Sequence, residues 1–180
     1  GAGRAGRRGR AAERGRWSRH LPRGSRSYST VAALASMAHL AYQKFENEGK
    51  EKELVREIMK GGGFKWIRGF FSKKTDTQAF LVVKDDKSYA VLAFRGTEPS
   101  KLTDVVTDAR ASLVSALAGR VHRGFMNAYQ SIEKDVEREI AKLKDIPIYI
   151  TGHSLGAALA TLATQCLEQN PVFRDQIAAC

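Results

Sequence analysis

The feature that most constrains this chain is a serine set between two glycines, where a β-rich run gives way to an alanine-rich helical run. Residues 148–151 are typical of a short strand, and a helix-forming stretch begins at Leu155. Only Gly152, His153 and Ser154 separate the two. A turn this tight predicts a helix that folds directly back against the strand, which is the basic unit of an α/β domain.

The rest of the chain alternates helical and strand-like segments, which favours an α/β fold with a largely parallel sheet. Residues 31–60 are expected to be helical, with a soft break at 47–49. Two strands are expected at 78–84 and 88–95, joined by a hairpin turn at 85–87. The nearly continuous apolar content of both strands predicts that they are covered on both faces.

The second half of the chain contains the clearest helical pattern. Apolar residues recur at spacings of three and four over residues 125–143, which predicts one long helix. The helix that begins at Leu155 is expected to end before Asn170 and Pro171. Residues 98–120 are expected to be irregular.

The Gly-x-Ser-x-Gly pattern at a strand-to-helix turn is typical of a serine nucleophile. A strained turn would point the Ser154 hydroxyl off the sheet edge, and a side chain at Gly152 or Gly156 would crowd the turn or the neighbouring strand. The N-terminus of the helix would direct free N–H groups, Leu155 first, at a developing oxyanion. The alternative is a tight turn in which Ser154 only caps the helix.

A second stretch predicts the other half of an oxyanion hole. The expected strand at 88–95 turns sharply at Gly96 and continues into Thr97. Thr97 offers a backbone N–H and a hydroxyl from a different loop at the same end of the sheet. We expect Arg95 to brace this loop through an ion pair and to take no part in the chemistry.

With these stretches in view, the sequence resembles the class 3 lipases, which are fungal-lipase-like members of the α/β-hydrolase fold. The resemblance spans about residues 30–170 and rests on four stretches in the family's order: 76–82, 93–98, 121–129 and 151–159. It implies a lipid acyl-ester hydrolase of the triacylglycerol lipase, diacylglycerol lipase or phospholipase A1 type.

The resemblance also implies a role for particular residues. Ser154 would be the nucleophile, and Thr97 and Leu155 would donate to the oxyanion. Asp108 would be a structural carboxylate near the site, and residues 98–117 would lie where the family carries a lid. The elbow itself would be supported by Gly152, His153 and Gly156.

The residues after Ser154 do not complete a catalytic triad. This fold places the acid and then the histidine after the serine, but only Glu168, Asp175 and no histidine follow here. Glu168 falls within the elbow helix, and Asp175 comes too early. We therefore expect an α/β-hydrolase fold truncated after the nucleophile-elbow helix, without the strands beyond that of Ser154 and inactive by itself. The alternative is a noncatalytic lipid- or partner-binding fragment of a lipase-like protein.

The net charge of +11 is concentrated at the N-terminus. Residues 1–30 contain nine arginines and one acid, and residues 31–180 are close to neutral. The sequence thus predicts a disordered leader or tail over 1–30 and a partial hydrolase domain over 31–180. The leader resembles an organellar transit peptide, with a cytoplasmic location as the alternative. A nucleic-acid partner is disfavoured, although Gly-Arg tracts can bind RNA phosphates.

The expected partner is a lipid substrate at a membrane or droplet surface. No apolar run reaches the ~20 residues of a transmembrane helix. The aromatic cluster at 64–71 and the loop at 98–117 are candidates for lipid contact, with core packing as the alternative for the cluster. No metal site has ligand-like spacing, the proposed chemistry needs no cofactor, and Cys166 is expected in the core.

Overall fold

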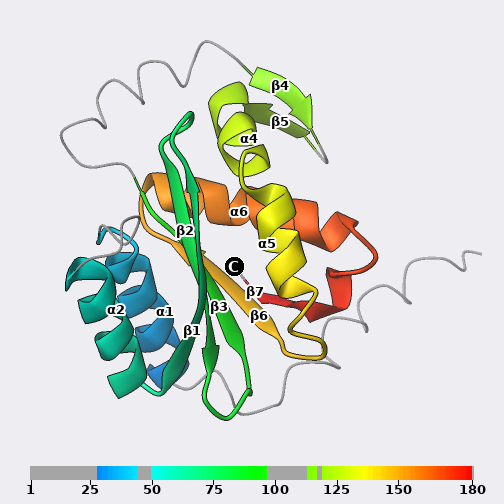
Figure 1. Cartoon of the computed structure of the whole chain (residues 1–180). Coiled ribbons are helices and arrows are strands. Elements are labelled where there is room, and N and C mark those ends of the chain that lie inside the picture. Colours follow the sequence, from blue (N-terminus) through cyan, green and yellow to red (C-terminus); the bar gives the residue numbers. More distant parts are fainter. Residues whose placement is uncertain (1–27, 44–49, 97–112, 117–118, 180) are drawn as a thin grey trace, which may run out of the picture.

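A five-stranded mixed sheet with helices on both faces forms the body of the molecule (Figure 1). The computed structural model describes residues 28–43, 50–96, 113–116 and 119–179. The strand order is β1-β2-β3-β6-β7. These strands are β1 (Phe64–Ser72), β2 (Thr77–Lys84), β3 (Ala90–Phe94), β6 (Ile148–Gly152) and β7 (Ile177–Ala179).

The sheet is parallel in only half of its pairings. β1, β2 and β3 pair antiparallel because short turns join them, whereas β3, β6 and β7 are parallel because helices connect them. The prediction of a largely parallel sheet is therefore wrong for its first half. The expectation that no strand lies beyond that of Ser154 is also wrong, because β7 pairs with the far side of β6.

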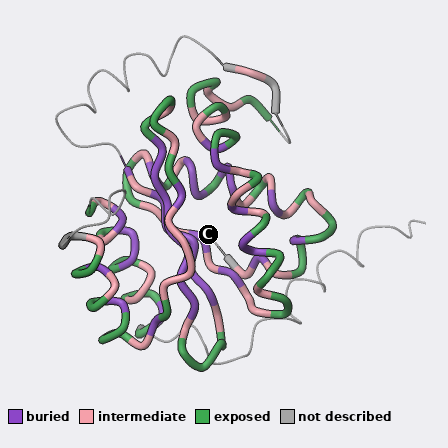
Figure 2. The backbone as a smooth tube through the Cα atoms, viewed as in Figure 1, coloured by how far each residue is buried: buried purple, intermediate pink, exposed green. Residues whose placement is uncertain are grey.

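Helices cover both faces of the sheet, as the apolar strands predict. α1 (Tyr28–Leu40) and α2 (Lys50–Gly61) pack on one face. α4 (Arg123–Gln130), α5 (Glu133–Ile140) and α6 (Leu155–Gln169) pack on the other. Alternate residues of β2 face the two sides, Phe80 toward α1 and α2 and Leu81 toward α4 to α6. Figure 2 shows the result, with buried strands between helices whose outer faces are exposed.

The long helix predicted over 125–143 is two helices, broken at Ser131 and Ile132. The Ser131 hydroxyl donates to the carbonyl of Ala128 at 2.7 Å and closes the end of α4. Ile132 is 3% exposed and packs into the core. The apolar spacing continues through the break, so periodicity alone could not reveal it.

Three further strands were not predicted. β1 occupies the aromatic cluster, where a bulge between Trp66 and Arg68 disturbs the alternation of side chains. β4 (Leu113–Ala116) and β5 (Gly119–His122) pair as a small antiparallel sheet, in which β4 and the first half of β5 fall in the region 98–120 expected to be irregular.

The aromatic cluster is mostly core. Phe64 and Phe70 are 5% and 2% exposed, and Trp66 stacks on Phe80 with ring centroids 5.4 Å apart. Phe71 alone among the aromatic side chains of β1 is substantially exposed, at 39%. Within the aromatic cluster, the candidate for lipid contact is therefore reduced to one end of β1. The other candidate, the loop at 98–117, lies outside the described residues except for 113–116.

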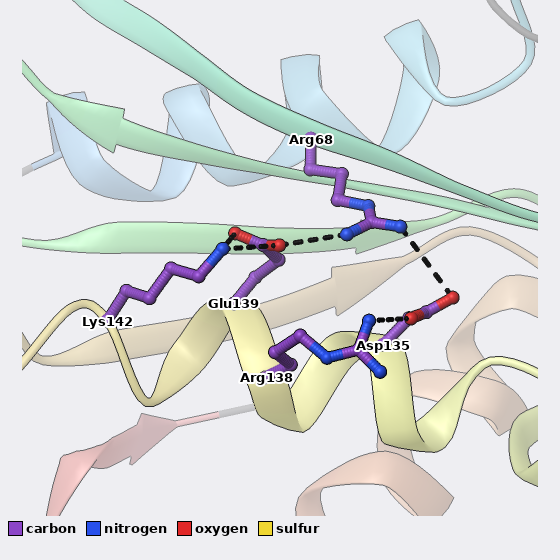
Figure 3. A network of polar contacts seen from close by, with 5 residues as sticks. All are labelled: Arg68, Asp135, Arg138, Glu139 and Lys142. Carbon is purple, nitrogen blue, oxygen red and sulfur yellow. Dashed lines mark hydrogen bonds and ion pairs between the residues drawn. The ribbon is translucent and has the colours of Figure 1, made fainter.

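An ionic network ties β1 to α5 (Figure 3). The Glu139 carboxylate is nearly buried and accepts from Arg68 at 2.9 Å and from Lys142 at 2.8 Å. Asp135 accepts from Arg138 at 2.7 Å and lies 3.8 Å from Arg68. Hydrogen bonds from Lys142 and Arg68 lower the pKa of Glu139 despite its burial.

The N-terminal leader falls outside the described residues, except that α1 already begins at Tyr28. Among the helices that the structure describes, none has both the length and the apolar content to span a membrane.

Candidate active site

Ser154 follows His153 in the two-residue turn between β6 and α6, and it has an unusual backbone conformation. Its φ of 56° and ψ of −124° lie outside the regions that L-residues ordinarily occupy. The residue is exposed, and its side chain makes no capping hydrogen bond to the helix. The alternative role of Ser154 as a helix-capping side chain is therefore not what the structure shows.

Two glycines allow this turn by close backbone packing. A Cβ on Gly152 would overlap the backbone carbonyl of Gly156. A Cβ on Gly156 would lie 2.5 Å from the carbonyl oxygen of Phe94 and 2.9 Å from the carbonyl carbon of Arg95. The first crowds the turn itself and the second crowds the neighbouring strand, as the sequence predicts.

The first turn of α6 follows Ser154 directly, and two of its N–H groups already have acceptors. Gly156 donates to the carbonyl of His153 and Ala157 to that of Ser154, both at 3.0 Å. Leu155 precedes them at the first helical position, where an N–H has no acceptor within the helix. The first turn contains no acidic residue, so the positive end of the helix dipole is not offset there.

The end of β3 lies directly against this turn. β3 and β6 are parallel, with Phe94 opposite Gly152. A Cβ on Gly96 would lie 2.5 Å from the His153 carbonyl oxygen, so the two loops touch through their backbones. Thr97 follows Gly96 immediately but, like Asp108, lies outside the described residues. The placement of both stays a prediction.

Arg95 braces the loop after β3, as expected. Its guanidinium donates to the Asp76 carboxylate at 2.6 Å and to the Asp76 carbonyl at 3.1 Å. The Arg95 N–H also donates to the carbonyl of Gln78 at 2.9 Å. The start of β2 thereby fixes the segment that leads into Thr97.

Tyr42 is a residue of the site that sequence reasoning missed. It follows α1, and its hydroxyl lies 3.1 Å from Nδ1 of His153. The same hydroxyl occupies the space that a Cβ on Gly96 would need. Tyr42 thus contacts both loops of the site, and its separation from them in the chain left no local signal.

Three histidines lie in the described residues, and no side-chain hydrogen bond joins any of them to Ser154 there. His122 caps α4, with Nδ1 accepting from the Gly124 N–H at 3.2 Å. His39 lies exposed in the last turn of α1, and the ring of His153 is engaged with Tyr42.

The acids that follow Ser154 do not supply a partner either. Asp175 lies in a 3₁₀ turn (Arg174–Gln176) that leads into β7. Asp175 precedes β7, whereas Ser154 follows β6. Because the two strands are parallel, Asp175 lies at the opposite end of the strands from Ser154. Glu168 lies near the far end of α6.

An open hollow of about 370 Å³ lies beside α6. Its apolar walls include Val121, Phe125 and Leu162, and Ala158 lines it one helical turn after Ser154. Arg120 and Gln165 add polar groups to the lining. Nowhere in the described part of the chain do three His, Cys, Asp or Glu side chains gather as metal ligands would.

The geometry can be compared with that of known proteins. A solved structure, the triacylglyceride lipase of Rhizomucor miehei, matches with a TM-score of 0.61 over 81% of this chain and 57% of that chain, at 20% identity. This likeness shows the α/β-hydrolase fold, as predicted.

Sequence relatives agree with the fold. A lipase from Rhizopus niveus is 32% identical over 111 residues, which cover 58% of this chain and 28% of the relative. A secreted alkaline triacylglycerol lipase from Penicillium cyclopium is 32% identical over 108 residues, which cover 53% of this chain and 37% of the relative. Phospholipase A1-II 1 from Oryza sativa subsp. indica is 32% identical over 130 residues, which cover 54% of this chain and 33% of the relative.

The chain spans about a third of the length of these curated relatives. Residues 91–180 match the family model described as Lipase (class 3), and this match runs from β3 through Ser154 to the last residue. The chain therefore belongs to the class 3 lipase family.

Proposed function

We propose that Ser154 is the nucleophile of a lipid acyl-ester hydrolase. The observation that carries the proposal is the backbone of Ser154, a positive φ at a non-glycine residue between β6 and α6 with its hydroxyl unused by the helix. Strained residues of this kind persist where the surrounding structure holds them and cluster at active sites. Relatives that include a triacylglycerol lipase and a phospholipase A1 support a lipid ester as the substrate.

The proposed reaction has two steps. In the first, the Ser154 oxygen attacks the acyl carbonyl, the Leu155 and Thr97 N–H groups stabilise the oxyanion, and the C–O bond to the alcohol breaks. The hydroxyl proton passes through a general base to the departing alcohol. In the second, water attacks the acyl-enzyme, releases the fatty acid and restores the hydroxyl.

The base and its acid are proposed to come from sequence outside these 180 residues. A serine hydroxyl is a weak nucleophile at neutral pH without an adjacent base. Among the described side chains no hydrogen bond joins Ser154 to a histidine or a carboxylate. The His153 ring is held by Tyr42, and Asp175 lies at the other end of the strands. The chain by itself is therefore proposed to be inactive.

The first experiment is to measure the mass of the native protein by immunoblot, with an antibody against residues 130–145. A species well above the 19.8 kDa of this chain would support a triad completed by further sequence. A species of that mass or less would contradict it and favour the noncatalytic lipid- or partner-binding alternative.

The second experiment measures ester hydrolysis by the native-length protein on triolein, diolein and phosphatidylcholine emulsions. We expect Ser154→Ala to lower the rate by at least about a thousandfold, because the nucleophile itself is removed. Ser88→Ala, exposed in the turn between β2 and β3 at the opposite end of the sheet from Ser154, serves as the matched control and should retain activity. Hydrolysis that survives Ser154→Ala would exclude Ser154 as the nucleophile.

A further inference from the structure

The β1–β2 hairpin tip, residues 71–76, lies at the same end of the sheet as Ser154. Ser72 pairs with Thr77 to close the hairpin, and Ala79 of β2 lies opposite Phe94 at the end of β3. β3 in turn ends beside Gly152. Figure 1 shows the hairpin extending past the edge at which α6 begins.

Hydroxyl groups hold this tip in a fixed shape. The Thr75 hydroxyl lies within hydrogen-bond distance of three others, those of Ser72 at 2.9 Å, Thr77 at 2.8 Å and Ser131 at 2.9 Å. Ser131 belongs to the junction between α4 and α5, so the tip is anchored to the helical layer. On its other side, Asp76 is paired with Arg95.

The chemistry of the hairpin tip is apolar and cationic. The Phe71 side chain is 39% exposed, and Lys73 and Lys74 are both exposed. Within the described residues neither lysine forms an ion pair, while Asp76, the carboxylate of the tip, is neutralised by Arg95. The tip therefore presents a partly exposed aromatic ring beside two uncompensated positive charges.

Another pair of exposed apolar side chains lies beside acidic residues instead of lysines. Leu54 and Ile58 on α2 are 58% and 47% exposed, but the acids Glu53 and Glu57 are exposed beside them. An anionic surface would repel that helix face, whereas it would attract the hairpin tip. Aromatic rings favour the boundary between headgroups and acyl chains, and each lysine near an anionic bilayer adds to the attraction.

We propose that the hairpin tip docks the protein on an anionic lipid surface, with the Phe71 ring entering the interface and Lys73 and Lys74 meeting lipid phosphates. Docking there would turn the Ser154 end of the sheet toward the lipid. The purpose of this orientation rests on the proposed function, but the docking itself needs no catalysis.

Vesicle co-sedimentation of the full chain tests the charges. The probe is phosphatidylcholine vesicles with and without about 30 mol% phosphatidylglycerol. We expect Lys73→Gln/Lys74→Gln to weaken partition onto the anionic vesicles by about 25-fold, at roughly fivefold per lysine. The matched control is Lys60→Gln/Lys65→Gln, whose two exposed lysines lie at the opposite end of the sheet.

The arginine-rich leader is constant in every variant, so equal losses in the two double variants would overturn the proposal and assign binding to net charge alone. A local probe provides the second test. Brominated lipids should quench the fluorescence that the Phe71→Trp variant gains. They should not quench the fluorescence that Leu54→Trp on α2 gains. Quenching equal in both variants, or absent from Phe71→Trp on vesicles that bind the chain, would contradict docking through the tip.

The two proposals can fail separately. Vesicle binding is measured without hydrolysis, so loss of docking leaves Ser154 as the proposed nucleophile. Conversely, Ser154→Ala should abolish hydrolysis and leave partition onto vesicles unchanged.

Discussion

The backbone of Ser154 is held in its conformation by its neighbours. A non-glycine residue in such a region costs of order 1–3 kcal/mol and persists only where the surroundings impose it. Here the imposition comes from β6, whose Ile148 and Ile150 are fully buried, and from α6, which packs on the same sheet. The strain is a property of the turn, and it can be measured without any catalytic activity.

At Ser154, glycine should be more stable than alanine. Glycine relieves the positive φ, while alanine keeps it, so we expect Ser154→Gly to exceed Ser154→Ala in free energy of unfolding by about 1 kcal/mol. Ser36, exposed within α1, provides the control with the opposite sign, since glycine in a helix interior costs about 1 kcal/mol relative to alanine. Urea denaturation of the four variants measures both differences. Alanine equal to or better than glycine at position 154 would mean that the turn is not strained.

At Gly156, alanine should be strongly destabilising although the residue lies in a helix. The added Cβ would meet backbone atoms of Phe94 and Arg95, which cannot move without shifting β3. We expect Gly156→Ala to lower the free energy of unfolding by more than about 2 kcal/mol. At Gly61 in α2 nothing lies within 4 Å of the added Cβ, so Gly61→Ala should be neutral or slightly stabilising. Equal effects at the two positions, compared by urea midpoint, would argue against the close approach of α6 to β3.

The ionic network between β1 and α5 makes the packing of two elements depend on pH. The pKa of Glu139 is lowered in the folded protein, first by the hydrogen bond from Lys142 and then by that from Arg68. A lowered pKa contributes stability above the unfolded value of 4.5, and this stability is lost as the pH falls through the folded value. The network should therefore stabilise α5 against β1 at neutral pH and not in acid.

Removal of the Glu139 charge should reveal this dependence. We expect Glu139→Gln to lower the free energy of unfolding at pH 7 by about 1–2 kcal/mol, because the charge-assisted hydrogen bonds from Arg68 and Lys142 weaken. The deficit should shrink toward zero as the pH falls through the lowered pKa of Glu139, because the wild-type carboxylate then becomes protonated as well. Glu53→Gln, exposed on α2, is the control and should change little at either pH. A deficit that stays constant with pH would mean that shape, and not charge, makes Glu139 matter.

Elements with strong local patterns could be predicted from the sequence, and those shaped by distant contacts could not. β2, β3, β6 and α6 were placed to within a residue or two, because continuous apolar runs and the glycine turn mark them. β1 was missed because its bulge disturbs the alternation, and the break at Ser131 because the apolar stripe continues through it. β7 was missed because three residues carry no pattern of their own.

The candidate site also contains residues that local sequence could indicate and one that only distant contacts bring into place. Gly152, Ser154 and Gly156 are contiguous in the chain, so their packing followed from steric argument. Tyr42 lies 111 residues from His153, and only the folding of α1 onto β6 and β3 brings them together. The hydroxyl of Tyr42 then fills the space beside Gly96, which no local spacing could indicate.

The whole molecule contains two hydrophobic clusters that share one sheet. One lies between the sheet and α1 and α2, and the other lies between the sheet and α4, α5 and α6. β2 and β3 contribute alternate side chains to both, and both strands are fully buried but for the last residue of β2. Because both clusters contain side chains of β2 and β3, separation of these strands from one cluster would also disrupt the other. We therefore expect the domain to unfold as one cooperative unit.

Two matched substitutions test this cooperativity. Val55 on α2 and Val136 on α5 are both fully buried, one in each cluster. We expect Val55→Ala and Val136→Ala each to cost about 1–3 kcal/mol, because each leaves a cavity of similar size. Urea unfolding is followed by two probes: Trp66 fluorescence, which reports on the face covered by α1 and α2, and far-UV circular dichroism. Each substitution should shift the transition midpoint by the same amount in both probes. A Trp17→Phe background removes the signal of the leader. If Val55→Ala shifted only the fluorescence transition, the two faces would unfold separately, and the layer of α1 and α2 that presents Tyr42 to the site could detach while β6 and α6 stay folded.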